Sequence, residues 1–409
     1  MKKRGFIRIL VLFALLFCVS SCSITSCKEK PEDEKVRSVL LYISANNNLY
    51  SYAEECIQDL KKGYVPQYQD KSEILLVFYH TPGKTPTLSR YSCNKDGVVI
   101  CETICIYEQE MNSSQVSSFS RVVADAERTY PATERGLILW SHATGWLPEG
   151  YYANPLDMAG DKSLQPVEDP YRFLVKSNEG EPLQKSFGSD NNSEMEITDL
   201  ATALTHHYEF ILFDCCLMGG IEVAYEFKDK CEYILFSPTE ILADGFPYHK
   251  MFSPIFNLEN REEALKQICS DYFEVYDAQT GIYRSATVSM VKCSALEDLA
   301  RVCASIYRNN QDSILTMDEF PLQIYYRYNK HWYYDFEDIV SRIATPEQYT
   351  EFKTALNNAI VYKAATDIFL NINIERYSGL STYLPRARYK ILNDFYKTLK
   401  WNIATGYVK

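Results

Sequence analysis

The strongest constraint on the fold comes from two short runs of almost entirely apolar residues. Residues 39–44 read VLLYIS and residues 74–79 read ILLVFY, and both are rich in branched and aromatic side chains. A strand with one face in water alternates apolar and polar residues, whereas a continuous apolar run suits a strand buried on both faces. Residues 49–62, between the two runs, have helical spacing. The pattern predicts a parallel sheet covered by helices.

The same alternation of strands and helices continues along the chain. Further strands are predicted at 136–140, 210–213 and 233–236, helices at 117–130, 196–206 and 219–227, and a hairpin at 87–91 and 98–106. Strands that alternate with helices indicate an α/β fold with a mostly parallel sheet flanked by helices. Beyond residue 306 the pattern loosens and tyrosines cluster at 325–334. We therefore expect a main domain at 38–306 and a smaller C-terminal subdomain at 307–409, with the tyrosines packed against the core rather than forming a binding platform.

The N-terminus has the pattern of an export signal. Three basic residues precede an apolar run at 9–17, which ends at small residues and Cys22. This order is typical of a secretory signal peptide, and the run is shorter than the roughly 20 residues of a membrane span. Because Val-Ser-Ser-Cys resembles the bacterial lipobox, we expect cleavage of residues 1–21 and lipidation of Cys22. A plain signal peptide with an incidental cysteine is the alternative.

The prediction that follows is an exported protein, lipid-anchored to a membrane of a bacterial cell envelope, either the outer membrane or the cell surface. Residues 22–37 contain the charged stretch KEKPEDEK and are expected to be a solvated acidic tether. Loss of residues 1–21 removes four cations, which moves the net charge from −12 to −16. A chain with this charge repels nucleic acid, so no nucleic-acid partner is expected.

Two predicted strands end in residues that carry chemistry. The first runs into Ser141 and His142, and the second runs into Asp214, Cys215 and Cys216. Functional groups in an open parallel sheet gather at the carboxyl ends of the strands, so an imidazole and a thiol meet if these strands are neighbours. An imidazole that takes the proton of a thiol turns it into a nucleophile. The alternative is a core cysteine and an ordinary loop histidine.

The same two stretches resemble the clostripain family of cysteine peptidases, which belongs to the caspase and gingipain clan. The stretches are LILWSHATGW at 137–146 and LFDCCLMGGIEVAYEF at 212–227. Weaker matches are SPTE at 237–240, GFPY at 245–248 and SGLSTYLP at 378–385. The resemblance implies a caspase-like fold from about residue 39 to the C-terminus, and a cysteine endopeptidase that cleaves proteins or peptides after arginine or lysine.

The resemblance also assigns roles to individual residues. His142 matches the general base, and Cys216 matches the nucleophile because it precedes Leu-Met-Gly. The main-chain N–H groups of Ala143 and Cys216 are expected to hold the oxyanion. Ala143 stands where the family has glycine, and Cys215 where it has alanine. These two departures keep open an alternative function, a catalytically inactive surface lipoprotein that binds protein.

Two aspartates are candidates for the pocket that selects a basic side chain. Asp214 matches the family aspartate beside this pocket, and Asp244 is a second candidate whose alternative role is a turn residue before Gly245. A carboxylate beneath a cationic side chain explains such a preference. No CxxC pair or zinc-type cluster occurs, so we expect no metal and no cofactor, although some relatives look calcium-dependent and calcium stays possible.

The polar stretch at 148–194 lies between the strand of His142 and the strand of Cys216 and is too long for an ordinary connection. In the family, maturation occurs by a cut in this insertion after a basic residue. Lys185–Ser186 has the features of such a junction, and self-cleavage there is predicted. The alternative is an intact lid in which Lys185 is a solvated loop residue.

Overall fold

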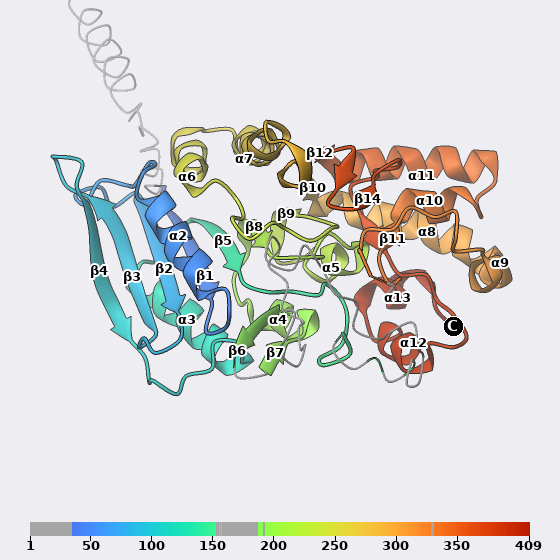
Figure 1. Cartoon of the computed structure of the whole chain (residues 1–409), viewed down its shortest axis with the longest axis horizontal. Coiled ribbons are helices and arrows are strands. Elements are labelled where there is room, and N and C mark those ends of the chain that lie inside the picture. The colour runs from blue at the N-terminus through green and yellow to red at the C-terminus, as the bar shows by residue number, and fades with distance from the viewer. Residues whose placement is uncertain (1–34, 153–154, 156, 158–186, 191–192, 329–330) are drawn as a thin grey trace, which may run out of the picture. The chain divides into compact units, whose positions relative to one another are not determined.

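The computed structural model describes residues 35–152, 155, 157, 187–190, 193–328 and 331–409. The predicted lipidation site, Cys22, and the predicted processing site, Lys185–Ser186, lie outside the described residues. Residues 36–409 form one compact unit. At its centre is a nine-stranded sheet with the order β12-β10-β9-β8-β5-β1-β2-β3-β4 (Figure 1).

The five central strands are parallel to one another. They are β9 (Cys231–Phe236), β8 (Tyr208–Asp214), β5 (Glu134–Trp140), β1 (Arg37–Ser44) and β2 (Glu73–His80). Both apolar runs that led to the fold prediction are here, and β1 is buried from Ser38 to Ser44. A strand in this position has neighbours on both edges and helices on both faces, so no position along it faces water. The predicted mostly parallel sheet is confirmed.

Antiparallel strands extend the sheet on both sides. The predicted hairpin forms β3 (Thr87–Cys93) and β4 (Val99–Ile106), while β10 (Thr287–Lys292) and β12 (Ile360–Ala365) form the other edge. The edge strand β12 belongs to the 307–409 segment, so that segment completes the main sheet. Three two-stranded sheets pair β6 (Phe187–Asp190) with β7 (Ser193–Met195), β11 (Tyr334–Asp335) with β15 (Ser381–Thr382), and β13 (Ile368–Phe369) with β14 (Ile372–Asn373).

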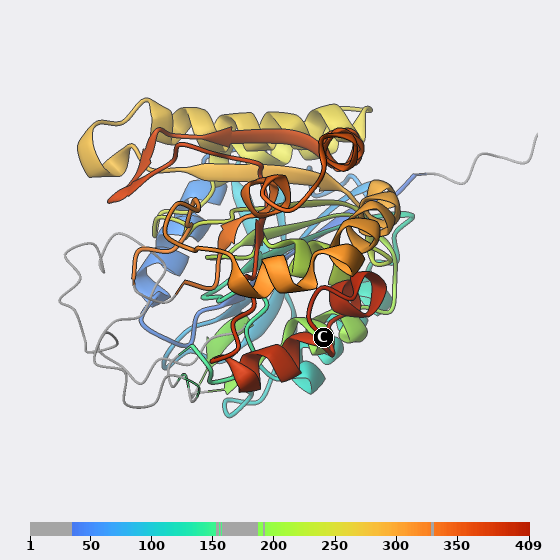
Figure 2. The same ribbon diagram turned by 90° about the vertical axis from the view of Figure 1, so that its right-hand side faces the viewer.

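Helices cover both faces of the sheet. One face packs on α2 (Tyr50–Leu60), α6 (Tyr248–Asn257) and α7 (Arg261–Asp277), and includes Leu41 and Ile43 of β1. The opposite face, with Leu40 and Tyr42, packs on the remaining helices. These are α3 (Val116–Thr129), α4 (Ile197–Ala203), α5 (Ile221–Glu226), α8 (Leu296–Asn309), α9 (Gln311–Thr316), α10 (Phe336–Ser341), α11 (Pro346–Ala359), α12 (Lys390–Tyr396) and α13 (Lys400–Thr405), with short 3-10 turns at Gly281–Tyr283 and Cys293–Ala295. Figure 2 shows α7, in yellow, and the red C-terminal helices on opposite sides of the sheet.

The tyrosine cluster belongs to the core. Tyr325, Tyr326, Tyr333 and Tyr334 are buried, as expected for packing rather than for a binding platform. Tyr333 also reaches the sheet rim, where its hydroxyl donates to the carbonyl of Thr144 at 2.6 Å. Among the described helices, none has the length and apolar character that a bilayer crossing requires.

Candidate active site

His142 and Cys216 occupy equivalent places at the same rim of the sheet. Strands β5 and β8 are parallel neighbours, and their last paired residues are Trp140 and Asp214. Each candidate residue follows its strand's last paired residue by two positions. Both are buried, with 0% of His142 and 2% of Cys216 exposed. The strand order therefore produces the juxtaposition of strand ends that the sequence predicted.

The turn after Cys216 is tight and strained. Leu217 has a φ of +62°, in the left-handed region that disfavours branched side chains and costs about 1–3 kcal/mol. Its N–H donates to the carbonyl of Thr239 at 2.9 Å, and the N–H of Gly219 donates to the carbonyl of Ser237 at 2.8 Å. A Cβ at position 219 would lie 2.4 Å from the nitrogen of Pro238, so only glycine fits. The segment after β9 thus fixes the backbone that carries the thiol.

The two adjacent thiols have different surroundings. The Sγ of Cys216 accepts a hydrogen bond from the N–H of Ile241 at 3.3 Å, an interaction that favours the thiolate. The thiol of Cys215 instead donates to the carbonyl of Leu139 on β5 at 3.1 Å and is fully buried. Cys215 therefore packs into the sheet, while Cys216 faces the segment that continues toward Asp244.

His142 has two contacts that were not anticipated. Its Nε2 lies 2.8 Å from the Oδ1 of Asn48, and its main-chain carbonyl accepts from the N–H of Gly188 at 3.0 Å. Asn48 is the last of three consecutive asparagines that follow β1. That run was the only sequence signal for this contact, and nothing local links it to a histidine 94 residues away.

The loop after His142 accommodates alanine in place of the family glycine. Within the described residues, the positive-φ positions that are not glycine are Leu217 and Leu370, so Ala143 has an ordinary backbone conformation and keeps its N–H. The position in this loop that requires glycine is Gly145. It has a φ of +66°, and a Cβ there would lie 2.5 Å from the carbonyl oxygen of Leu217. The histidine and cysteine loops touch backbone to backbone at this point.

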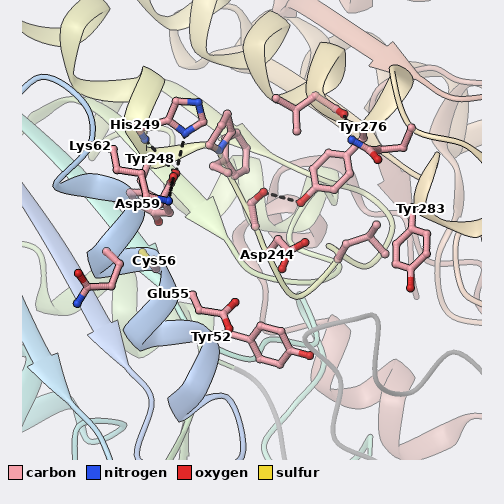
Figure 3. A pocket seen from close by; sticks show the side chains of 17 residues that line it. Tyr52, Glu55, Cys56, Asp59, Lys62, Asp244, Tyr248, His249, Tyr276 and Tyr283 are labelled. Carbon is pink, nitrogen blue, oxygen red and sulfur yellow. Dashed lines mark hydrogen bonds and ion pairs between the residues drawn. The ribbon is translucent and has the colours of Figure 1, made fainter.

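A cavity of about 520 Å³ lies on the α2 and α7 side of the sheet. It is lined by residues of α2, the end of α7, Tyr283, Leu242 and residues 244–249. Cys216 is not among the lining residues, and the chain link between them is Leu242, which follows the Ile241 that contacts Cys216. Figure 3 shows Asp244 between the side chains of Glu55 and Tyr283. The pKa of Tyr52 in the cavity wall is raised, first by burial and then by the negative charges of Asp244 and Glu55. Within the described part of the chain neither of these carboxylates forms an ion pair, so the cavity is negatively charged.

Asp214 and Asp244 have different positions relative to this cavity. Asp214 is fully buried and is not among the residues that line it. Its Oδ2 accepts from the hydroxyl of Tyr248 at 3.0 Å and from the N–H of Phe246 at 3.4 Å. Asp214 therefore holds the turn from which Asp244 projects, and of the two candidates Asp244 is the one that lines the cavity.

A buried ion pair also supports the nucleophile loop. Arg327 binds Glu240 with two hydrogen bonds, Nε to Oε2 at 2.5 Å and Nη2 to Oε1 at 3.0 Å, and both side chains are no more than 2% exposed. Glu240 directly precedes Ile241. The tyrosine-rich segment of Arg327 is thus attached to the residue beside Ile241, which contacts Cys216, and no sequence pattern indicated this link.

A second buried cluster holds β6, which lies within the 148–194 stretch. The carboxylate of Asp190 accepts from Ser113 N–H at 2.6 Å and from Asn46 Nδ2 at 2.8 Å, and lies 3.1 Å from Nδ1 of His80. Burial works to raise the pKa of Asp190, but the hydrogen bonds from His80, Ser113 and Asn46 outweigh it and hold the pKa below its usual value. Because Gly188 on the same strand binds His142, this cluster helps to fix the histidine.

The comparisons with known proteins place the chain in a family. The model of the clostripain family matches residues 41–162 and 175–404. The chain belongs to the clostripain family of cysteine peptidases. A curated relative, clostripain of Hathewaya histolytica, is 23% identical over 57% of this chain, and the chain spans only 44% of that relative's length.

Solved structures agree with this assignment. An inactive zymogen of a C11 protease from Parabacteroides distasonis is 30% identical with a TM-score of 0.73, and covers 91% of this chain and 98% of its own. A secreted C11 cysteine protease from Bacteroides thetaiotaomicron, bound to an irreversible peptide inhibitor, is 25% identical with a TM-score of 0.71, and covers 91% of this chain and 99% of its own. The fold is the caspase-like, mostly parallel sheet that the resemblance implied.

Proposed function

We propose that this protein is a cysteine endopeptidase whose nucleophile is Cys216 and whose general base is His142. The observation that carries the proposal is the arrangement at the rim, where β5 and β8 are parallel neighbours and end in the two family motifs. His142 takes the proton of the Cys216 thiol, the thiolate attacks the scissile carbonyl carbon, and the imidazolium returns the proton to the leaving amine. Water then hydrolyses the acyl-enzyme, again with His142 as the base.

The oxyanion of the tetrahedral intermediate is assigned to the main-chain N–H groups of Ala143 and Cys216. The ordinary backbone conformation of Ala143 supports this assignment, because alanine then supplies the same donor as glycine. The strained turn at Leu217 supports it as well, because it fixes the peptide of Cys216 relative to the histidine loop.

The proposed substrates are proteins or peptides with arginine or lysine before the cleaved bond. The support is the negatively charged cavity that contains Asp244 and Glu55 and is lined by Leu242, the residue after Ile241. We assign the cation-binding carboxylate to Asp244, with Asp214 holding its turn in place through Phe246 and Tyr248. The peptide inhibitor bound by the Bacteroides relative supports a peptide substrate.

We further propose that the chain is made as a zymogen and cuts itself at Lys185–Ser186. The near-complete burial of His142 and Cys216 supports this, because both residues have almost no surface in contact with solvent in this structure. A structural relative is described as an inactive zymogen. The buried Asp190 cluster would keep β6 in place after a cut four residues upstream of that aspartate.

We also propose that the protein is exported and carries a lipid on Cys22. The support is the lipobox-like sequence and a structural relative that is described as secreted. The expectation of no cofactor, with calcium left possible, stays a prediction. Among the described residues no group of three or more His, Cys, Asp or Glu is placed to hold a metal ion.

The test is a fluorogenic peptide assay combined with iodoacetamide labelling of the purified protein. A thiolate at Cys216 is expected to react at neutral pH and to be protected by an arginyl peptide inhibitor, while Cys215 stays unlabelled. Absence of both labelling and cleavage, after any processing, would favour the alternative of an inactive protein-binding lipoprotein.

A further inference from the structure

Three consecutive asparagines after β1 have three different partners. Asn46 donates from Nδ2 to Asp190 at 2.8 Å, and Asn47 accepts at Oδ1 from the N–H of Leu49 at 2.8 Å. The Oδ1 of Asn48 lies 2.8 Å from Nε2 of His142. The first contact holds a neighbouring strand and the second shapes the turn into α2, so only the third reaches the candidate active site.

We infer that Asn48 is a positioning residue that sets the tautomer and orientation of His142, an inference that rests on the proposed peptidase function. With the Oδ1 of Asn48 facing the ring, the Nε2 of His142 carries the hydrogen, because a carbonyl oxygen can only accept a hydrogen bond. In the neutral imidazole the lone pair is then on Nδ1. Asn48 therefore selects Nδ1 as the nitrogen that accepts the proton of the Cys216 thiol.

The loop that carries Asn48 is held closely against the loop that carries His142. Ser141 donates from its hydroxyl to the carbonyl of Ser44 at 2.6 Å, and the N–H of Ala45 donates to the carbonyl of His80 at 2.9 Å. Because Asn46 and Asn47 have their own partners, the backbone on both sides of Asn48 is restrained. Asn48 itself is exposed and lies over a buried ring, so its amide can change without opening the core.

The choice of an amide rather than a carboxylate has a consequence for the proton transfer. When His142 is protonated, the amide oxygen still accepts from Nε2–H and stabilises the imidazolium through its dipole alone. A carboxylate in the same place would add a full charge and raise the pKa of His142 further. We therefore expect Asn48→Asp to raise the pKa of His142, and Asn48→Ala to lower it and release the tautomer preference.

The experiment uses ¹⁵N NMR of the full-length Cys216→Ala protein, in which the imidazole titrates without the thiol. The expected result is an Nε2–H tautomer, a pKa that rises in the Asn48→Asp variant and falls in the Asn48→Ala variant, and mixed tautomers in the latter. In the otherwise unmodified enzyme Asn48→Ala should lower kcat by roughly tenfold to 100-fold with little change in KM, as for other residues that orient a catalytic group. Asn47→Ala is the matched control, since the Oδ1 of Asn47 accepts from the N–H of Leu49 at the turn into α2.

Each outcome decides the inference. An unchanged tautomer and pKa in a folded Asn48→Ala variant would overturn it, and so would an equal loss of kcat in Asn47→Ala. If Asn48→Ala does not fold, the nearly isosteric Asn48→Asp variant gives the same test through the direction of its pKa change. The NMR readout needs no activity, so a protein that stays inactive after cleavage in the 148–194 stretch would refute the proposed function while leaving the role of Asn48 measurable.

Discussion

Replacement of Asp244 by asparagine should remove most of the preference for a basic side chain. The substrate cation would enter a cavity in which Asp244 and Glu55 are the carboxylates without an ion pair among the described residues. Two unit charges 4 Å apart interact by about 1 kcal/mol in water and about 4 kcal/mol near a protein surface. Asp244 is on an exposed turn but faces a cavity, so we expect a loss of about 1.5–3 kcal/mol, or roughly tenfold to 150-fold in kcat/KM for arginyl peptides.

The assay compares fluorogenic peptides that differ only in having arginine, lysine or leucine before the scissile bond. Cleavage after leucine should be unaffected by Asp244→Asn, so the ratio of the rates isolates the charge. Asp59→Asn is the matched control in the same cavity, because that carboxylate already accepts from Nδ1 of His249 at 2.8 Å and lies 3.5 Å from Lys62. An unchanged arginine-to-leucine ratio in Asp244→Asn, or an equal drop in Asp59→Asn, would refute the assignment of the pocket.

Three further predictions follow from the same geometry. Cys216→Ala should abolish cleavage in the fluorogenic assay while Cys215→Ala keeps most of it, because the Cys215 thiol faces the Leu139 carbonyl; the opposite pattern would misplace the nucleophile. The purified Cys216→Ala protein should stay as one chain, whereas the unmodified protein should yield a fragment that begins at Ser186 by N-terminal sequencing; an uncut, fully active protein would end the zymogen proposal. Since the pKa of Asp190 is lowered in the folded state, its stabilising contribution is present above the unfolded value near 4 and is lost as the pH falls through the lower folded value. Urea unfolding should therefore show Asp190→Asn to be less stable by roughly 1–3 kcal/mol at pH 7, with the difference shrinking below about pH 4; a difference independent of pH would contradict the charge argument.

Much of the fold could be predicted from the sequence, because burial patterns are local. The runs at 39–44 and 74–79 consist almost entirely of apolar residues, which predicts strands in the middle of a sheet that is covered on both faces. They form β1 and β2. The two strand-end motifs were also visible, since they required only that a strand stop next to a histidine or a cysteine. One predicted helix is longer than the observed one: the helix expected at 196–206 ends at Ala203, before the chain enters β8.

Only the tertiary structure decided which residues around those motifs line the cavity and which support the loops. The sequence offered Asp214 as the family pocket aspartate and Asp244 as a second candidate. In the structure Asp214 is buried and Asp244 lines the cavity, an arrangement that depends on where Phe246 and Tyr248 contact Asp214. The sequence also did not predict the contact of Asn48 with His142 or the Glu240–Arg327 pair. The two residues of each contact are 94 and 87 positions apart along the chain. Strand formation depends on the pattern of neighbouring side chains, whereas a hydrogen bond between distant segments depends on the packed positions of both. The sequence alone therefore indicated the candidate residues for the chemistry, and the packing of the sheet determined which residues hold those candidates in place.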